Sequence, residues 1–127
     1  MHLRKNQGFS LLEIMIVVLI IGLLAGGIAL TLSGNVTQAR QNRAKSDIAV
    51  IVKAVEQYRL NNGVYPSNRD GLDVLDIDGT LDPWGRPYQY ETPGPGDRDY
   101  LVITYGADGR EGGDDEAADV SSATFKQ

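Results

Sequence analysis

A long apolar segment near the start of the chain constrains the fold more than any other feature of the sequence. Residues 9–32 form a run of 24 residues in which only Glu13 is ionisable. As an α-helix this run would extend about 36 Å, more than the roughly 30 Å hydrocarbon core of a bilayer. We therefore predict a membrane-spanning helix. Because Arg4 and Lys5 precede it, and basic residues stay on the cytoplasmic side, the rest of the chain is expected outside the cytoplasm.

Glu13 and the length of the segment distinguish three explanations. An ordinary secretory signal peptide has an apolar region of about 7–15 residues, so this segment is too long, although residues 25–27 (AGG) imitate a cleavage site. A plain signal anchor would bury the Glu13 carboxylate at a cost of at least ~2–3 kcal/mol. Cleavage between Gly8 and Phe9 would instead create an ammonium four residues from Glu13, able to neutralise this carboxylate or that of a neighbouring copy.

Residues 5–13 (KNQGFSLLE) closely resemble the leader and cleavage site of the type IV pilin superfamily, which includes the pseudopilins. The resemblance implies that a prepilin peptidase cuts after Gly8 and that the new amine of Phe9 is methylated. It also implies that Glu13 helps to set the register of subunits in a helical filament. The chain would then comprise a leader peptide (1–8), a transmembrane and filament-core helix (9–32) and a periplasmic domain (33–127).

Three glycines and an absent proline leave two interpretations of the apolar helix open. Pilins often have a proline where this chain has Leu30, preceded by a weakened stretch that can extend during assembly. Gly22, Gly26 and Gly27 either soften the helix, since each glycine costs about 1 kcal/mol relative to alanine, or allow neighbouring helices to approach closely.

The following residues predict an amphipathic continuation of the same helix. From residue 36 onward, apolar residues recur at helical spacing. They form one stripe, which consists of Ala44, Ile48, Ile51, Val52 and Val55. Residues 61–63 (NNG) are expected to end the helix, because glycine suits a left-handed cap and Pro66 follows as a stop. Residues 33–35 (SGN) are a place where the helix is free to loosen.

Two later segments predict a small antiparallel sheet. Residues 82–90 (DPWGRPYQY) combine a proline-led turn with a short alternating segment, and residues 100–105 are predicted as the next strand. The sequence DPWG also closely resembles a segment that precedes the sheet in the major pseudopilins of type II secretion systems. We expect Trp84 to pack the sheet onto the helix rather than to bind sugar. The acidic residues 76–79 do not fit an EF-hand loop and are predicted to form a solvated turn.

The densest group of potential metal ligands is a glycine-rich acidic loop after the second predicted strand. Residues 105–119 (YGADGREGGDDEAAD) include four aspartates, two glutamates and four glycines. Calcium takes six to eight oxygen ligands, and a flexible loop can fold around it. Without a cation these acids would repel one another. A disordered acidic tail is the alternative that composition alone favours.

Resemblance shifts this balance towards calcium, because the major pseudopilins carry a calcium loop of the form S-L-G-x-D-G followed by a glycine and several acids. This chain has TYGADG at residues 104–109. On that match Asp108 is the best side-chain ligand, and the backbone carbonyl of Tyr105 is its companion. One alignment then uses Asp115 and Glu116, and another uses Asp119. The ligands favoured for a structural calcium ion are Asp108, Asp115 and Asp119, with Asp114 in reserve.

Composition argues against other functions. The chain has no cysteine, and its only histidine, His2, would leave with the leader. An enzymatic function is not expected, because the remaining chain offers no thiol, imidazole or nucleophile-elbow serine. The formal net charge of −5 disfavours nucleic acid as a partner.

These features predict an α+β protein of the type IV pilin-like class, in which one long N-terminal helix packs on a small antiparallel sheet with a C-terminal calcium loop. The expected function is that of a structural subunit of a periplasmic pseudopilus that drives type II protein secretion across the outer membrane. Before assembly the chain would cross the bacterial inner membrane once, with its C-terminal domain in the periplasm. Implied partners are further copies of the chain, minor pseudopilins, an inner-membrane assembly platform and the prepilin peptidase. The alternatives are a subunit of a surface type IV pilus and a non-polymerising, membrane-anchored calcium-binding module.

Overall fold

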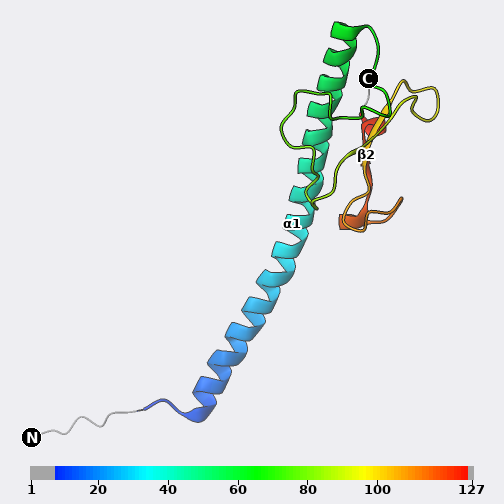
Figure 1. Ribbon diagram of the computed structural model, residues 1–127. Coiled ribbons are helices and arrows are strands. Elements are labelled where there is room, and N and C mark those ends of the chain that lie inside the picture. The colour runs from blue at the N-terminus through cyan, green and yellow to red at the C-terminus, as the bar shows by residue number, and fades with distance from the viewer. Residues whose placement is uncertain (1–7, 126–127) are drawn as a thin grey trace, which may run out of the picture. The chain divides into compact units, whose positions relative to one another are not determined.

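The computed structural model describes residues 8–125, which contain one long helix, α1 (Leu11–Asn62), and a small three-stranded sheet (Figure 1). The chain divides into two compact units, Met1–Asn35 and Val36–Gln127. Helix α1 is continuous, so it does not loosen at residues 33–35. A long helix followed by an antiparallel sheet confirms the predicted α+β class.

Ser10 caps the start of α1. The backbone N–H of Glu13 donates to Ser10 Oγ at 3.2 Å, and the backbone N–H of Ile14 donates to the Ser10 carbonyl at 3.2 Å. Serine is among the best N-cap residues, and Ser10 followed by Glu13 matches the S-x-x-E capping pattern. Gly8 and Phe9 therefore lie ahead of the helix.

The apolar segment in the first unit is not covered by the residues of that unit that the structure describes. Its large side chains between Phe9 and Ile28 are 47–79% exposed. An 18-residue window of α1 has a mean hydropathy of 2.8 and is 0% buried, so the helix is long and apolar enough to cross a membrane. The space beside Gly22 and Gly26 is empty to 4 Å, so packing within the described chain does not require these glycines. Helix softening and close helix packing both stay predictions.

In the second unit, one face of α1 contributes to the hydrophobic core. Ala44, Ile48 and Val55 are 0% exposed and Ile51 is 2% exposed, which confirms the predicted stripe. Val52 lies at the edge of the stripe and is only partly buried.

The end of α1 also agrees with the sequence. The helix ends at Asn62, and Gly63 follows with a φ of +79°. The backbone N–H of Gly63 donates to the Arg59 carbonyl at 2.7 Å, which satisfies one of the last helical carbonyls. Glycine adopts this left-handed conformation at little cost because it has no Cβ.

The sheet connects three short strands, β1 (Gln89–Glu91), β2 (Leu101–Thr104) and β3 (Val120–Ser121), antiparallel and in the order β1-β2-β3. The sequence predicts the first two strands but not β3, because two residues are too few to show an alternating pattern. The acidic loop connects β2 to β3 and contains the short 3-10 helix η1 (Asp115–Ala117). It is therefore an internal connection rather than a tail. A second 3-10 helix, η2 (Ser122–Thr124), follows β3.

Buried tyrosines join the rest of the core to α1. Tyr88 and Tyr100 are 5% and 6% exposed, and their hydroxyls donate to Asp47 and Glu56, respectively, at 3.0 Å each. Burial, followed by the hydrogen bond to each carboxylate, raises the pKa of both hydroxyls well above the ordinary value for tyrosine. Trp84 packs against the same core, as predicted. The core also contains Leu72, Leu75, Val102 and Val120.

The raised tyrosine pKa values predict a loss of stability in alkaline solution. Below pH 10.0, the ordinary tyrosine value, the contribution of these hydroxyls is fully present. As the pH rises from there towards the folded-state pKa, the unfolded chain ionises while the folded chain keeps its protons. The free energy of unfolding should then fall by up to about 1.4 kcal/mol per pH unit for each tyrosine. Tyr100→Phe should flatten this decline in urea titrations relative to the wild type; equal slopes for the variant and the wild type would contradict the assignment.

Candidate functional site

The predicted processing site lies just before the helix. Gly8 and Phe9 adopt no regular secondary structure, and Phe9 is 79% exposed. Glu13 lies in the first turn of α1, where the partial positive charge of a helix N-terminus favours a carboxylate. Arg4 and Lys5 lie outside the described residues. The peptide bond between Gly8 and Phe9 is thus outside the helix, and Glu13 follows within one turn.

In the second unit, the buried carboxylate of Asp82 organises the turn of residues 82–86. Its Oδ1 accepts the backbone N–H groups of Trp84 at 3.0 Å and Arg86 at 2.8 Å, and its Oδ2 accepts the Thr104 hydroxyl. The backbone N–H of Asp82 donates to the Arg86 carbonyl at 2.7 Å. Because Thr104 is the last residue of β2, Asp82 attaches this turn to the strand that leads into the acidic loop.

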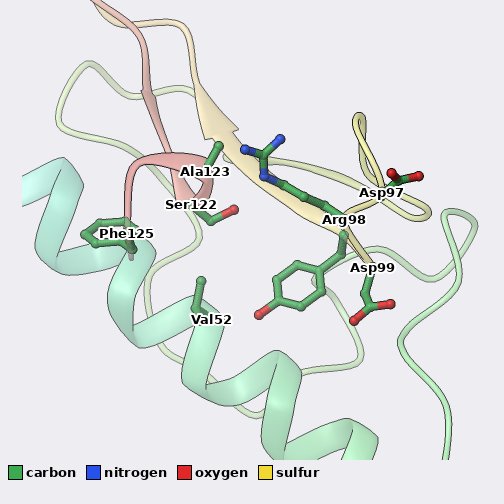
Figure 2. Close-up of a pocket in the computed structure, with 8 residues that line it drawn as sticks. Val52, Asp97, Arg98, Asp99, Ser122, Ala123 and Phe125 are labelled. Carbon is green, nitrogen blue, oxygen red and sulfur yellow. The ribbon is translucent and has the colours of Figure 1, made fainter. Parts of the chain in front are cut away.

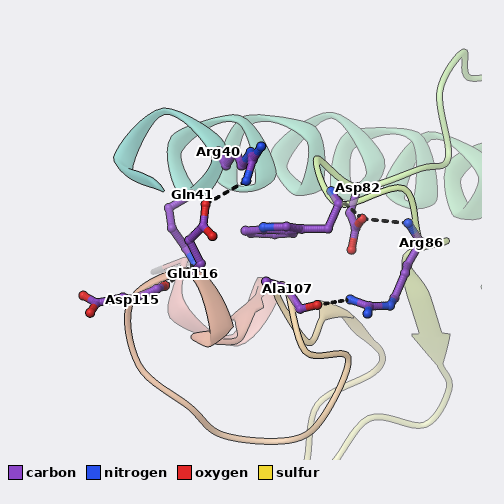
Figure 3. Close-up of polar contacts among 8 residues, drawn as sticks. Arg40, Gln41, Asp82, Arg86, Ala107, Asp115 and Glu116 are labelled. Carbon is purple, nitrogen blue, oxygen red and sulfur yellow. Dashed lines mark hydrogen bonds and ion pairs between the residues drawn. The ribbon is translucent and has the colours of Figure 1, made fainter. Parts of the chain in front are cut away.

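Arg86 extends from the turn to the start of the acidic loop. Its Nη1 donates to the carbonyls of Gly106 and Ala107 at 2.8 Å each, and Figure 3 shows the contact with Ala107. A Cβ on Gly109 would lie 3.0 Å from the guanidinium carbon, so the loop passes closely over this side chain. The backbone N–H of Ala107 also donates to the Glu116 carbonyl at 2.8 Å, which links the two ends of the loop.

Two side chains of α1 hold the far end of the loop. Arg40 forms an ion pair with Glu116 at 2.8 Å (Figure 3). Gln41 Nε2 donates to the carbonyls of Asp115 at 2.8 Å and Ala118 at 3.2 Å. An exposed ion pair contributes only about 0–1 kcal/mol, so the hydrogen bonds of Gln41 are the more dependable part of this attachment.

Asp119 and Asp108 differ in how far their oxygens are satisfied. Asp119 Oδ2 accepts the backbone N–H of Gly112 at 2.8 Å, whereas Asp119 Oδ1 is buried without a hydrogen-bond donor. Asp108 is exposed, and its Oδ1 accepts the backbone N–H of Arg110 at 3.1 Å. A buried, unpaired carboxylate oxygen is costly, so Asp119 is the predicted ligand most in need of a further partner.

The other predicted ligands lie elsewhere around the loop. Asp114 and Asp115 are exposed, and Asp115 has a φ of +52°, which is uncommon for a residue with a side chain. Tyr105 is half-buried immediately after β2. Within residues 8–125, no three acidic, cysteine or histidine side chains are gathered closely enough to hold a metal ion. The structure therefore does not bring the predicted set together as a cluster.

A separate cavity of about 280 Å³ lies in the second unit (Figure 2). Its polar groups take part in bonds that support the fold: Ser122 Oγ accepts the backbone N–H of Val102 at 3.0 Å, and Asp99 Oδ2 accepts the Tyr65 hydroxyl at 3.3 Å. No base is paired with Ser122 among the residues that line the cavity, which are Val52, Asp97, Arg98, Asp99, Tyr100, Ser122, Ala123 and Phe125.

Three contacts in these regions are not predicted by the sequence analysis. The cap formed by Ser10 has a readable signal in the S-x-x-E pattern. The contacts of Arg86 and Gln41 have none, because both side chains bind backbone carbonyls that any residue would provide.

An uncovered apolar helix, a processing-type sequence ahead of it, and an amphipathic continuation packed on a small antiparallel sheet together define a subunit of the type IV pilin-like class. Comparison with known proteins narrows this class. Residues 31–80 and 77–123 match the family described as "Type II secretion system (T2SS), protein G", and residues 3–29 match the "Prokaryotic N-terminal methylation motif".

Relatives and a solved structure agree with this family. The type II secretion system core protein G of Vibrio cholerae is 40% identical, over 94% of this chain and 93% of the relative. The protein of the same name from Pseudomonas aeruginosa is also 40% identical, over 96% of this chain and 98% of the relative. The crystal structure of the major pseudopilin from the type 2 secretion system of enterohaemorrhagic Escherichia coli superimposes with a TM-score of 0.59 and 26% identity, covering 74% of this chain and 95% of that one.

The chain belongs to the family of type II secretion system core protein G, the major pseudopilins. It is a structural subunit of that system, and the matches favour this function over a surface pilin or a non-polymerising module. Family membership implies assembly into a pseudopilus with other components of the system. The apolar helix and the relatives fit a membrane-anchored subunit that faces the periplasm.

Asp82→Ala is predicted to lower the free energy of unfolding by about 2–4 kcal/mol, because it leaves one hydroxyl and two backbone N–H groups without their acceptor. Asp78→Ala is the matched control, since Asp78 is exposed and should change stability by less than about 0.5 kcal/mol. Urea denaturation of the full-length chain in detergent measures both values. Similar small losses for the two variants would show that Asp82 does not organise the turn.

Proposed function

We propose that the chain is the subunit of a periplasmic pseudopilus that drives folded proteins through the outer membrane. In its stored form it crosses the inner membrane once, with residues 33–127 in the periplasm. An inner-membrane assembly platform then extracts copies of the chain into a homopolymer, with minor pseudopilins as further partners. The observation that carries the proposal is the uncovered apolar segment, whose exposed side chains require lipid or other helices around them.

Processing supplies the charge that makes this segment suitable for both environments. A prepilin peptidase cuts the bond between Gly8 and Phe9, which lies ahead of the Ser10 cap, and the new amine of Phe9 is methylated. The Glu13 carboxylate in the first helical turn then faces an ammonium of its own chain or of a neighbouring copy. Neutralisation matters because an unpaired carboxylate within a bilayer is costly.

Glu13→Ala should leave cleavage intact but abolish filaments and secretion, since it removes the charge that pairs with the Phe9 amine. Ser10→Ala is the matched control: it removes the helix cap, worth about 1 kcal/mol, and keeps the carboxylate. Mass spectrometry of the mature N-terminus, electron microscopy of filaments and assays of secreted protein follow the three steps. Normal secretion by Glu13→Ala, or a mature chain that does not begin at Phe9, would overturn the proposal.

The acidic loop is proposed to bind a structural calcium ion through Asp108, Asp115, Asp119 and the Tyr105 carbonyl, with Asp114 as a reserve ligand. Two observations support a cation here. Asp119 Oδ1 is buried without a donor, and the loop offers carboxylate and carbonyl oxygens, which calcium prefers. The ion would neutralise the mutual repulsion of the acids and stabilise the connection between β2 and β3.

Calcium at about 100 times its dissociation constant should stabilise the folded chain by about 2.7 kcal/mol over chelator-treated protein. The measurement is thermal or urea unfolding of the full-length chain in detergent, with magnesium as a comparison, because magnesium accepts fewer geometries. Asp119→Asn should abolish the calcium effect, whereas Asp78→Asn, outside the loop, should retain it. The calcium proposal fails if calcium and chelator give the same stability.

A further inference from the structure

We propose that the Arg86 guanidinium holds the first turn of the acidic loop, residues 106–107, in place. It does so whether or not a divalent ion is bound. The guanidinium Nη1 donates to two successive carbonyls, those of Gly106 and Ala107, at 2.8 Å each. Charged donors form stronger hydrogen bonds than neutral ones. The Gly106 and Ala107 carbonyls, which lie where the loop leaves β2, therefore accept hydrogen bonds from the positively charged Arg86 side chain.

The turn below Arg86 presents the guanidinium from a fixed position. Asp82 accepts the backbone N–H of Arg86 at 2.8 Å, and the backbone N–H of Asp82 donates to the Arg86 carbonyl at 2.7 Å. The same carboxylate accepts the Thr104 hydroxyl at the end of β2. The contacts form a closed ring: Thr104 donates to Asp82, Asp82 accepts from Arg86, and Arg86 donates to the carbonyl of Gly106, two residues after Thr104. The side chain of Arg86 thus connects the turn to the loop.

Glycine at two positions allows the close contacts of the loop, and Gly109 lies directly against Arg86. A Cβ on Gly109 would lie 3.0 Å from both the guanidinium carbon and Nε of Arg86, so any larger residue would press on the guanidinium. Gly109 also has a φ of +66°. At Gly106 a Cβ would lie 2.7 Å from the Glu116 carbonyl oxygen, so the absence of a side chain allows the two ends of the loop to meet.

The far end of the loop is tied by protein groups as well. Gln41 donates to two of its carbonyls, and Arg40 pairs with Glu116. The turn of residues 82–86 thus holds the start of the loop, and α1 holds its far end. The acidic residues between them, from Asp108 to Asp115, are exposed. We expect the ends to be ordered without metal and only the middle of the loop to respond to calcium. The role of Arg86 does not rest on the calcium proposal.

Hydrogen exchange of the full-length chain in detergent, with chelator present, tests the inference at the Ala107 amide, which donates to the Glu116 carbonyl. In the wild type this amide should be protected. Arg86→Met should accelerate its exchange by at least about tenfold, the consequence of losing charged hydrogen bonds to both carbonyls. Arg86→Lys should lie between, because an ammonium keeps the charge and can donate to carbonyls.

Arg110→Met is the matched control, because it also removes one arginine charge beside the acids of the loop, but at an exposed side chain that makes no hydrogen bond or ion pair within residues 8–125. It should leave the Ala107 amide protected. Protection of the Val102 amide, in the core, reports whether each variant remains folded. Equal exchange at Ala107 in Arg86→Met and Arg110→Met, or an unprotected Ala107 in chelated wild type, would overturn the inference.

Repeating the hydrogen-exchange measurement with added calcium distinguishes this inference from the calcium proposal. If added calcium protects no amide between Asp108 and Asp115, the calcium proposal fails, while the difference between Arg86→Met and Arg110→Met still supports the role of Arg86. If calcium restores the Ala107 amide of Arg86→Met and chelated wild type is unprotected there, the ion rather than Arg86 fixes the first turn.

Discussion

The buried carboxylate of Asp82 connects segments that the sheet alone is too small to hold. The three strands comprise only residues 89–91, 101–104 and 120–121, so most of the described second unit outside α1 lies in turns and loops. Asp82 accepts from two backbone N–H groups of its own turn and from Thr104 at the end of β2. Asp82, which is 4% exposed, therefore joins the turn of residues 82–86 to the end of β2, where the acidic loop begins. Because three donors share this one carboxylate, its removal would leave all three without an acceptor.

Helix α1 has to satisfy two different surroundings with one backbone. Its first part carries apolar residues on all sides, and none of the described residues of the first unit covers them. Its second part keeps one apolar stripe and turns charged residues such as Lys45 and Lys53 to the solvent. A helix suits both settings because its backbone hydrogen bonds are internal, so the side chains alone determine whether lipid, protein or water surrounds it.

Local sequence signals predict the regular elements well and the contacts of the loop poorly. The stripe from Ala44 to Val55 follows from helical periodicity, and the end of α1 follows from Gly63, since both depend on residues close in sequence. The two residues of β3 give no pattern, because they pair only after the loop has brought them to β2. The contact of Arg86 with the loop also has no signal in the sequence, because whether an arginine reaches a carbonyl twenty residues away depends on the fold. The calcium ligands are chosen by resemblance to the family. The described residues do not gather these side chains into a cluster, so the ligand set stays a proposal.

The start of α1 at Leu11 has a consequence for how a subunit could leave the membrane. In the proposed topology, Arg4 and Lys5 would oppose this step, because on insertion scales each basic residue costs about 2.5–3.5 kcal/mol at the centre of a bilayer. Cleavage after Gly8 would remove both cations without disturbing the Ser10 cap. The one ammonium that replaces them would already have a carboxylate within the next turn. The cut would thus change the work of extraction while leaving the folded chain as it was.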